Sequence, residues 1–251
     1  MENNLAIKIT NVSKTYKLRS TKVKTIRERV TNLVAGKYIE NDKIVALKNI
    51  NLYINQGESF GIIGKNGSGK STLINIIMET IKPDIGGNID VYGKVMRLAL
   101  GLGIDANLSA RDNIYVNGSI IGLSFRKIGT IFDQIIEFAG IPDFVDTPVK
   151  FYSKGMKQRL MFSIAMHANA DIFLLDEFFG GTGDQEFRIK SDIAFKKRIL
   201  NGKTNVIVSH SLQTIRKHCE RALWIHKGKI LLIDDVDTVI KAYMKFIKSN
   251  K

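Results

Sequence analysis

The chain has 251 residues, 44% of them hydrophobic, and a formal net charge of +14 at pH 7. That length and apolar content suffice for one large domain with its own buried core. The excess of positive charge favours a polyanionic partner, either nucleic acid or the anionic face of a membrane. No apolar run approaches the ~20 residues that span a bilayer, and the N-terminus lacks the basic and apolar regions of a signal peptide. Cys219 is the only cysteine, which excludes an internal disulfide and suits a reducing compartment.

The first expected elements are strands of a small antiparallel β subdomain. Leu5–Thr10 and Asn51–Asn55 have the residue pattern of strands, and Asn88–Tyr92 adds a third. Between the first two lies an insertion, residues 17–45, which is rich in lysine and arginine. Apolar residues at helical spacing over Lys24–Ala35 suit a basic amphipathic helix at a membrane surface. A solvated insertion whose apolar stripe packs on the domain is the alternative, and the sequence leaves both open.

A glycine-rich loop joins the next strand to the next helix. The segment Gly64-Lys-Asn-Gly-Ser-Gly-Lys-Ser-Thr72 follows the apolar run Phe60–Ile63 and leads into Leu73–Met78, which suits a helix. Glycines let the backbone turn its N–H groups inward, and the helix N-terminus adds partial positive charge, so the pattern predicts a phosphate cradle for a nucleotide. Lys70 would reach the terminal phosphates, and the Ser71 hydroxyl would bind Mg²⁺. The predicted phosphate-binding residues are Gly64, Asn66, Gly67, Ser68, Gly69, Lys70, Ser71 and Thr72.

Two carboxylates end another apolar run farther along the chain. Asp171-Ile-Phe-Leu-Leu-Asp-Glu177 suits a buried parallel strand whose carboxyl end meets the nucleotide. We expect Asp176 to bind Mg²⁺ and Glu177 to polarise the attacking water, because adjacent groups at a strand end can divide the metal and base duties. The phosphate loop alone does not distinguish a kinase, a GTPase and a mechanical ATPase.

Between these two motifs lies a predicted helical region. Helices are expected over Asp112–Gly122 and Arg126–Ala139, and another begins at Ser153, a suitable N-cap. Here the chain resembles the ATP-binding-cassette (ABC) ATPases, because their usual signature Leu-Ser-Gly-Gly-Gln appears as a five-residue variant followed by Gln158 and Arg159. The variant signature consists of Tyr152, Ser153, Lys154, Gly155 and Met156.

This resemblance covers nearly the whole chain and implies an α/β fold. The expected fold is a P-loop ABC-type ATPase domain with a RecA-like parallel-sheet core, a small antiparallel β subdomain and a helical subdomain at about residues 96–168. Residues 1–251 would form this single ATP-binding domain. The pattern after Arg221 fits a hairpin of Arg221–His226 and Lys229–Ile233, followed by a final helix.

The family pattern also implies functions for residues outside the phosphate loop. ATP would lie between two copies of the chain, with Ser153 and its helix N-terminus in one copy facing the γ-phosphate bound by the other. His210 occupies the place of the family's switch histidine, and Tyr16 that of the aromatic residue that stacks on adenine. For both, ordinary packing is the alternative. Asp184 matches the family's inter-subunit aspartate if one extra residue is allowed.

One family residue is missing, and its absence is informative. ABC ATPases carry a glutamine between the phosphate loop and the signature, but here the corresponding segment Val95–Ile104 offers Ala99 or Leu100. The variant run from Leu100 to Ile114, like Gly183–Phe187, resembles bacterial exporters of O-antigen, capsule and teichoic acids. The residue that replaces the glutamine stays unassigned.

The exporter resemblance implies ATP and Mg²⁺ as cofactors. It implies three partners: a second copy of the chain, an integral membrane transporter subunit, and a lipid-linked polysaccharide that is reached through that subunit. The chain would then be peripheral at the cytoplasmic face of the bacterial cytoplasmic membrane. One alternative is a cassette of another transporter class, which the long insertion and the missing glutamine disfavour. The other is a soluble ABC ATPase acting on nucleic acid. Such proteins usually carry two cassettes or a long coiled coil, so we expect no nucleic acid partner.

Overall fold

The computed structural model describes residues 4–17, 43–98, 103–176 and 185–249. Several predictions lie outside these ranges. They concern most of the basic insertion, including the amphipathic helix expected at Lys24–Ala35, and also Ala99, Leu100, Glu177 and Asp184.

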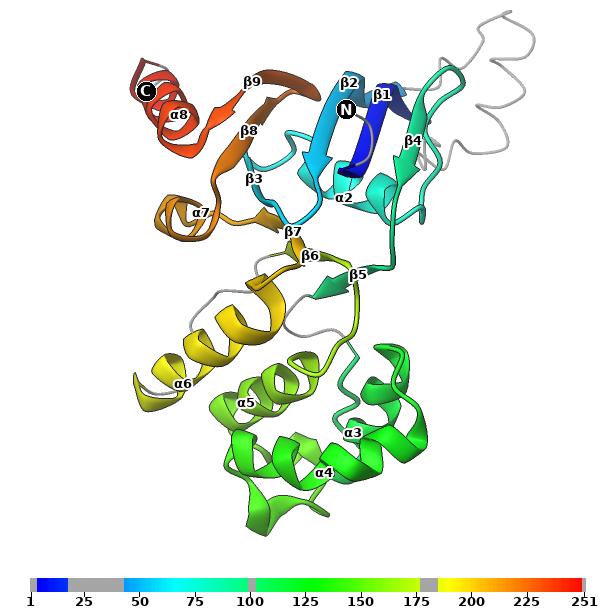
Figure 1. The fold of residues 1–251 in the computed structure, drawn as a ribbon, viewed down its shortest axis with the longest axis vertical. Coiled ribbons are helices and arrows are strands. Elements are labelled where there is room, and N and C mark those ends of the chain that lie inside the picture. Colours follow the sequence, from blue (N-terminus) through cyan, green and yellow to red (C-terminus); the bar gives the residue numbers. More distant parts are fainter. Residues whose placement is uncertain (1–3, 18–42, 99–102, 177–184, 250–251) are drawn as a thin grey trace, which may run out of the picture.

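The larger of two sheets has six strands in the order β5-β6-β7-β3-β8-β9 (Figure 1). Its strands are β3 (Ser59–Ile63), β5 (Val95–Leu98), β6 (Ile172–Asp176), β7 (Thr204–Val208), β8 (Arg221–His226) and β9 (Lys229–Asp235). The first five strands in spatial order pair in parallel, whereas β9 returns antiparallel to β8 as the predicted hairpin. The inner strands are buried on both faces, which is why their sequences are continuous apolar runs.

A smaller antiparallel sheet has the order β2-β1-β4. Its strands are β1 (Leu5–Lys17), β2 (Lys43–Asn55) and β4 (Asn88–Val91). Strands β1 and β2 extend well beyond the predicted Leu5–Thr10 and Asn51–Asn55. The added residues are mostly polar or half-exposed, and several shifts of register interrupt the pairing, so the apolar alternation that marks a strand in sequence is weak there.

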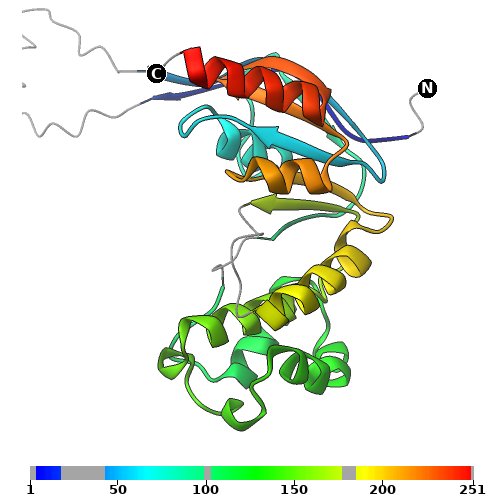
Figure 2. The ribbon, with the colours of Figure 1, turned by 90° about the vertical axis from the view of Figure 1, so that its left-hand side faces the viewer.

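Helices cover the sheets and form a separate group at one end of the molecule. Those described are α2 (Lys70–Ile77), α3 (Ala110–Ile120), α4 (Phe125–Ala139), α5 (Lys154–Ala165), α6 (Gln185–Phe195), α7 (Leu212–His218) and α8 (Val236–Ser249), with short turns η1 (Pro142–Phe144), η2 (Val149–Phe151) and η3 (Lys196–Leu200). Figures 1 and 2 both show α3, α4 and α5 together, on the far side of β5 and β6 from α8.

The boundary expected for the helical region needs a correction. The sequence predicts that this region begins at about residue 96, but residues 96–98 pair with β6 as part of β5 in the parallel sheet. A four-residue strand whose partner lies far along the chain carries no periodic signal of its own. The helices α3 to α5 do have a separate apolar core, which includes Ile114, Ile128, Ile135 and Leu160.

The helix after the phosphate loop is buried between the two sheets. Leu73 and Ile77 of α2 are fully buried in one core with Ile9 of the small sheet and Phe60 of the large one. Each such side chain stabilises the fold by about 1.5–3 kcal/mol. The start of α2, and with it the phosphate loop, is therefore fixed by fully buried side chains of both sheets and of the helix itself.

Two predictions from composition, on the single cysteine and on membrane-spanning segments, can be compared with the structure. Cys219 is buried as a free thiol, and burial raises its pKa to about 12, so it stays protonated at neutral pH. No helix among the described residues has both the length and the apolar character required to cross a membrane.

His167, just after α5, predicts a pH dependence of stability. Burial and then Arg198, whose Nη1 lies 3.1 Å from His167 Nδ1, lower the pKa of His167 to about 4. The unfolded chain binds a proton there at about pH 6.5, so stability should fall as the pH decreases from about 6.5 toward 4. His167 is only half-buried, and solvent screening limits the effect to about 1 kcal/mol. Urea unfolding at pH 7.5 and pH 5 should show a smaller loss for His167→Gln than for the wild type, and equal losses would contradict this.

Candidate functional site

The phosphate loop forms the predicted turn between β3 and α2. Its residues Gly64, Gly67 and Gly69 have positive φ values of 157°, 73° and 113°. A Cβ atom on Gly64 would lie 2.3 Å from the carbonyl oxygen of Ile225, and one on Gly69 would lie 2.7 Å from that of Ala46. Glycine is therefore required at both positions by close backbone contact as well as by conformation.

The loop ends at a helix N-terminus whose N-cap residue is a glycine. Gly69 is the N-cap of α2, and it has no side chain that could accept a hydrogen bond from the first-turn N–H groups. Lys70 is buried, and its Nζ donates to the Gly64 carbonyl at 2.7 Å and to the Lys65 carbonyl at 3.2 Å. The α2 helix dipole, the first-turn N–H groups and the Lys70 ammonium thus lie together where an anion can bind.

An open cleft of about 540 Å³ lies over this loop. The predicted residues that line it are Asn66, Gly67, Gly69, Lys70, Ser71, Thr72, Asp176 and His210. The predicted residues Gly64 and Ser68 do not line the cleft. The Ser68 carbonyl accepts a hydrogen bond from the Gly228 N–H at 2.9 Å, and the Ser68 side chain is buried. One cleft thus unites two motifs more than 100 positions apart in the sequence.

Sheet pairing explains how the distant residues reach this cleft. Asp176, the last residue of β6, pairs with Val208, the last residue of β7, so the carboxyl ends of these strands lie side by side. His210 follows β7 by two residues and is exposed. In a parallel sheet this edge is where ligands bind.

Five residues that line the cleft were missed by the sequence argument, and one of them is Val208 at the end of β7. Ile44, Val45 and Ala46 come from the start of β2, and Lys227 comes from the turn between β8 and β9. Lys227 has a φ of 47° and is exposed. The predicted hairpin of Arg221–His226 and Lys229–Ile233 already places Lys227 in a turn, but the position of this turn against the phosphate loop depends on tertiary packing.

Tyr16 is placed beside the cleft rather than in its lining. It pairs across the strands with Ile44, so the two side chains lie on the same face of the small sheet, and Ile44 lines the cleft. The Lys14 Nζ lies 5.8 Å from the centre of the Tyr16 ring. This arrangement leaves the predicted stacking on adenine untested.

Tyr16→Ala should weaken ATP binding if the ring stacks on the base. The expected loss is that of one base–aromatic contact, ~1–3 kcal/mol, and Tyr16→Phe should retain most of the affinity. Tyr53→Ala is a matched control, because Tyr53 is an exposed tyrosine of the same sheet, 47% accessible, that does not line the cleft. Calorimetric titration with ATP measures the difference. Equal affinities for wild type and Tyr16→Ala would show that the ring only packs.

The signature segment begins α5 as predicted. Ser153 is its N-cap, and the Ser153 Oγ accepts a hydrogen bond from the Met156 N–H at 3.1 Å. Lys154 is exposed and Gly155 is half-exposed on the first turn. Tyr152 instead points inward and is buried. None of these residues lines the cleft over the phosphate loop of the same chain.

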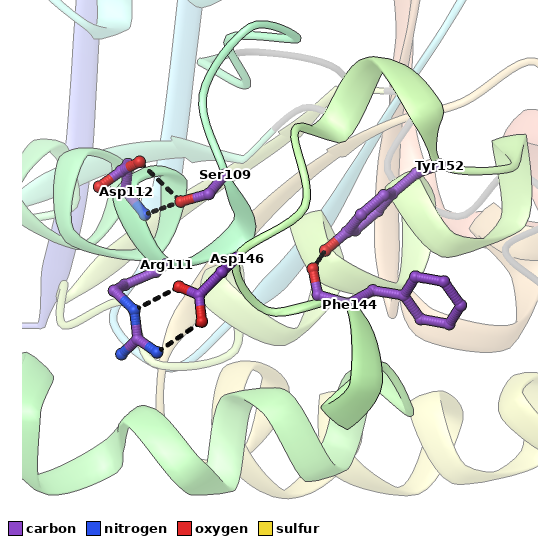
Figure 3. Close-up of polar contacts among 6 residues, drawn as sticks. All are labelled: Ser109, Arg111, Asp112, Phe144, Asp146 and Tyr152. Atoms are coloured by element: carbon purple, nitrogen blue, oxygen red, sulfur yellow. Dashed lines mark hydrogen bonds and ion pairs between the residues drawn. The ribbon is translucent and has the colours of Figure 1, made fainter.

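A set of polar contacts fixes the approach to the signature (Figure 3). The Tyr152 hydroxyl donates to the Phe144 carbonyl, and the Arg111 guanidinium binds Asp146 with Nε at 2.8 Å and Nη2 at 3.2 Å. The hydrogen bond from Arg111 lowers the pKa of the Asp146 carboxyl. Burial raises the pKa of Tyr152, which keeps its hydroxyl a donor. The start of α5 is thus tied to the segment before it.

A glycine-rich loop, an uncapped helix and a carboxylate at a strand end meet at one edge of a parallel sheet. Together they define a P-loop nucleotide-binding domain. The chain belongs to the ABC transporter family, whose family model matches residues 47–180, and it is an ATP-binding ATPase subunit of that family. The family and the fold class predicted from the sequence are confirmed.

Related proteins and structures agree with this assignment. The chain is 39% identical to "Teichoic acids export ATP-binding protein TagH" of Levilactobacillus brevis, over 99% of this chain and 67% of that protein. With the protein of the same name from Enterococcus faecalis the identity is 38%, over 98% of this chain and 54% of the relative.

Among solved structures, "Dimeric structure of a post-hydrolysis state of the ATP-binding cassette MJ0796 bound to ADP and Pi" superposes with a TM-score of 0.68. The identity is 24%, over 92% of this chain and 98% of that chain. "Structure of ATP binding subunit of ABC transporter" gives a TM-score of 0.69 at 18% identity, over 95% and 93% of the two chains. At these identities the likeness concerns the fold.

Proposed function

We propose that the chain hydrolyses ATP to drive the export of a lipid-linked polysaccharide of the teichoic-acid type through a separate membrane subunit. The observation that carries this proposal is the 39% identity, over 99% of the chain, to a protein named for teichoic acid export. The sequence motifs alone are equally compatible with O-antigen and capsule exporters, whereas the relatives reported above are named for teichoic acid export. The relatives are longer than this chain, which spans 67% of the first and 54% of the second. Teichoic acid as the material exported with this chain is therefore part of the proposal.

The cleft has the donors that Mg²⁺ prefers. The Ser71 hydroxyl and the Asp176 carboxylate come from different elements and line the same cleft, and both are hard oxygen ligands. Mg²⁺ held by Ser71 and Asp176 would neutralise negative charge on the nucleotide phosphates. Lys70 and the first-turn N–H groups of α2 would hold the same phosphates.

Water activation is assigned to Glu177, which directly follows Asp176 in the sequence. Asp176 ends β6 and lines the cleft, and Glu177 is the acidic residue that follows it in the sequence. A carboxylate there can accept the proton of an attacking water while Asp176 holds the metal. His210, at the end of the neighbouring strand, would contact the terminal phosphate from its own side.

Two copies of the chain would complete each site. The exposed start of α5, with Ser153 at its N-cap, contributes no lining residue to the phosphate cleft of its own chain. A helix N-terminus is well suited to stabilise a γ-phosphate, so the signature would act on ATP bound by the partner. Asp184 would belong to the same interface.

The membrane subunit and the membrane surface are the remaining proposed partners. A net charge of +14 and the basic insertion at residues 17–45 suit the anionic cytoplasmic face of a membrane, where each basic residue contributes about 1 kcal/mol. The chain would therefore be peripheral at that face, held chiefly by an integral subunit through which the glycan passes.

Purification of the tagged chain from membranes of its source tests this proposal. We expect one integral membrane protein to co-purify, and the assembled complex to hydrolyse ATP faster when the lipid-linked polymer is supplied. The Lys70→Ala variant should co-purify equally well but show no stimulation, because assembly does not require the phosphate loop. Recovery of nucleic acid, or of an importer subunit with no response to the polymer, would overturn the proposal.

A further inference from the structure

Arg97 connects the predicted metal ligand to the helix of the phosphate loop. Arg97 lies on β5, beside β6 in the parallel sheet, and its Nη2 lies 2.5 Å from the Asp176 Oδ2. Its Nη1 donates to the Asn75 Oδ1 on α2 at 3.4 Å. One guanidinium therefore spans from the carboxylate that lines the nucleotide cleft to the helix that begins at Lys70.

The ion pair is partly buried and incomplete. The side chains of Arg97 and Asp176 are 28% and 19% exposed. The Arg97 Nε is buried, and within the described ranges it has no hydrogen-bond partner. Only one guanidinium nitrogen binds the carboxylate, whereas an optimal arginine–carboxylate pair is bidentate. This pair therefore lacks the second hydrogen bond that a bidentate pair has.

Space for a second position of the guanidinium lies next to it. A cavity of about 360 Å³ opens between the sheet edge and the helical region, and Arg97 and Asn75 form part of its wall. Leu98, Asn117, Ile121 and Met161 also line it. Asp176 is not among its lining residues, so the cavity offers the Arg97 side chain room away from the carboxylate.

We propose that Arg97 is a displaceable counter-ion of Asp176, a positioning residue that Mg²⁺ must displace when it binds with the nucleotide. The inference rests on the proposed function, because it takes Asp176 as a metal ligand. Mg²⁺ approaches its oxygen ligands to about 2.0–2.1 Å, and a guanidinium on the same carboxylate repels it. Without Mg²⁺, in contrast, Arg97 neutralises Asp176 and so lessens its repulsion of the phosphates. Arg97 would therefore reduce the dependence of nucleotide binding on Mg²⁺.

Calorimetric titration with the ATP analogue AMP-PNP, in excess Mg²⁺ and in EDTA, measures this dependence as the ratio of the two dissociation constants. For Arg97→Gln the preference for Mg²⁺ should increase about fivefold over wild type, the size expected for one partly exposed ion pair. Arg97→Lys keeps the charge and should stay near the wild-type ratio. An unchanged ratio in Arg97→Gln, with binding intact, would overturn the inference alone. Absence of AMP-PNP binding by the wild type would instead overturn the proposed function.

Two controls separate displacement from a structural effect. Arg216→Gln removes the same charge from an exposed pair, in which Arg216 Nε lies 2.7 Å from Asp237 Oδ1, and should leave the ratio unchanged. In an Asp176→Asn background, Arg97→Gln should no longer alter the ratio, because the carboxylate it balances is gone. A shift of equal size in that background would count against the inference.

Wild-type protein offers a test that does not depend on the folding of a variant. In protein labelled with ¹⁵N-arginine, the Nε–H signal of Arg97 should move when Mg²⁺ is added to the AMP-PNP complex and stay in place when AMP-PNP is added in EDTA. The signal of Arg221, whose Nη1 lies 2.8 Å from Glu58 Oε1, serves as the internal reference. An Arg97 signal that is indifferent to Mg²⁺ would overturn the displacement.

Discussion

Lys70→Ala should weaken ATP binding by about 10- to 100-fold, with or without Mg²⁺. The Lys70 ammonium lies at the start of α2, lines the cleft, and is held over the loop by the Gly64 and Lys65 carbonyls. Charge-assisted hydrogen bonds to phosphate contribute about 1.5–3 kcal/mol each, which corresponds to this loss of affinity. Titration with ATP by calorimetry, in Mg²⁺ and in EDTA, gives the two dissociation constants.

The neighbouring lysine supplies the control for this experiment. Lys65 belongs to the same loop and carries the same charge, but it is exposed, does not line the cleft, and lies 5.9 Å from the centre of the Phe246 ring. Lys65→Ala should therefore bind ATP with nearly wild-type affinity. Circular dichroism should show that both variants are folded. Equal ATP affinity in Lys70→Ala and wild type would contradict the assignment of the phosphate loop.

The sequence could predict the phosphate loop because everything that defines it is contiguous. Gly64 to Thr72 carry the turn, the ammonium and the hydroxyl within one segment, and the apolar runs on both sides fix it between a strand and a helix. Ser153 was predictable for the same reason, since a helix N-cap is a local feature. Local chemistry of this kind needs no knowledge of sheet order.

Contacts across the sheets could not be predicted in this way. Arg97 and Asp176 are 79 positions apart and meet only because β5 and β6 are neighbours. The four-residue sequence of β5 gives no signal from which this pairing could be predicted. Ile44 and Lys227 reach the cleft through the pairing of β2 and the turn after β8. Such residues are selected by tertiary packing, and their types are common on any surface. The missing glutamine drew attention to Val95–Ile104, but only the fold shows that Arg97 in this segment contacts Asp176.

Glu177→Gln should lower ATP turnover by about 10²- to 10⁴-fold while leaving ATP affinity within a small factor of wild type. The amide has the size of the carboxylate but cannot accept the proton of the attacking water, and general base catalysis contributes about that much. The variant leaves the phosphate loop, Ser71 and Asp176 unchanged, so the nucleotide should still bind. Steady-state hydrolysis and ATP titration of the same preparation measure both quantities.

The same variant should accumulate as a dimer with ATP trapped between its copies, because the proposed interface assembles on the γ-phosphate and disassembles only after hydrolysis. Light scattering coupled to size-exclusion chromatography should detect a doubled mass in Mg²⁺ and ATP, and the monomer mass in ADP.

Glu186→Gln, at an exposed glutamate in the first turn of α6, makes the same chemical change and should behave as wild type. Adding Lys70→Ala to Glu177→Gln should abolish the dimer, since the trap requires bound ATP. Near-wild-type hydrolysis by Glu177→Gln would show that Glu177 is not the base. Slow hydrolysis without a dimer would agree with Glu177 as the base but would contradict an ATP site shared between two copies.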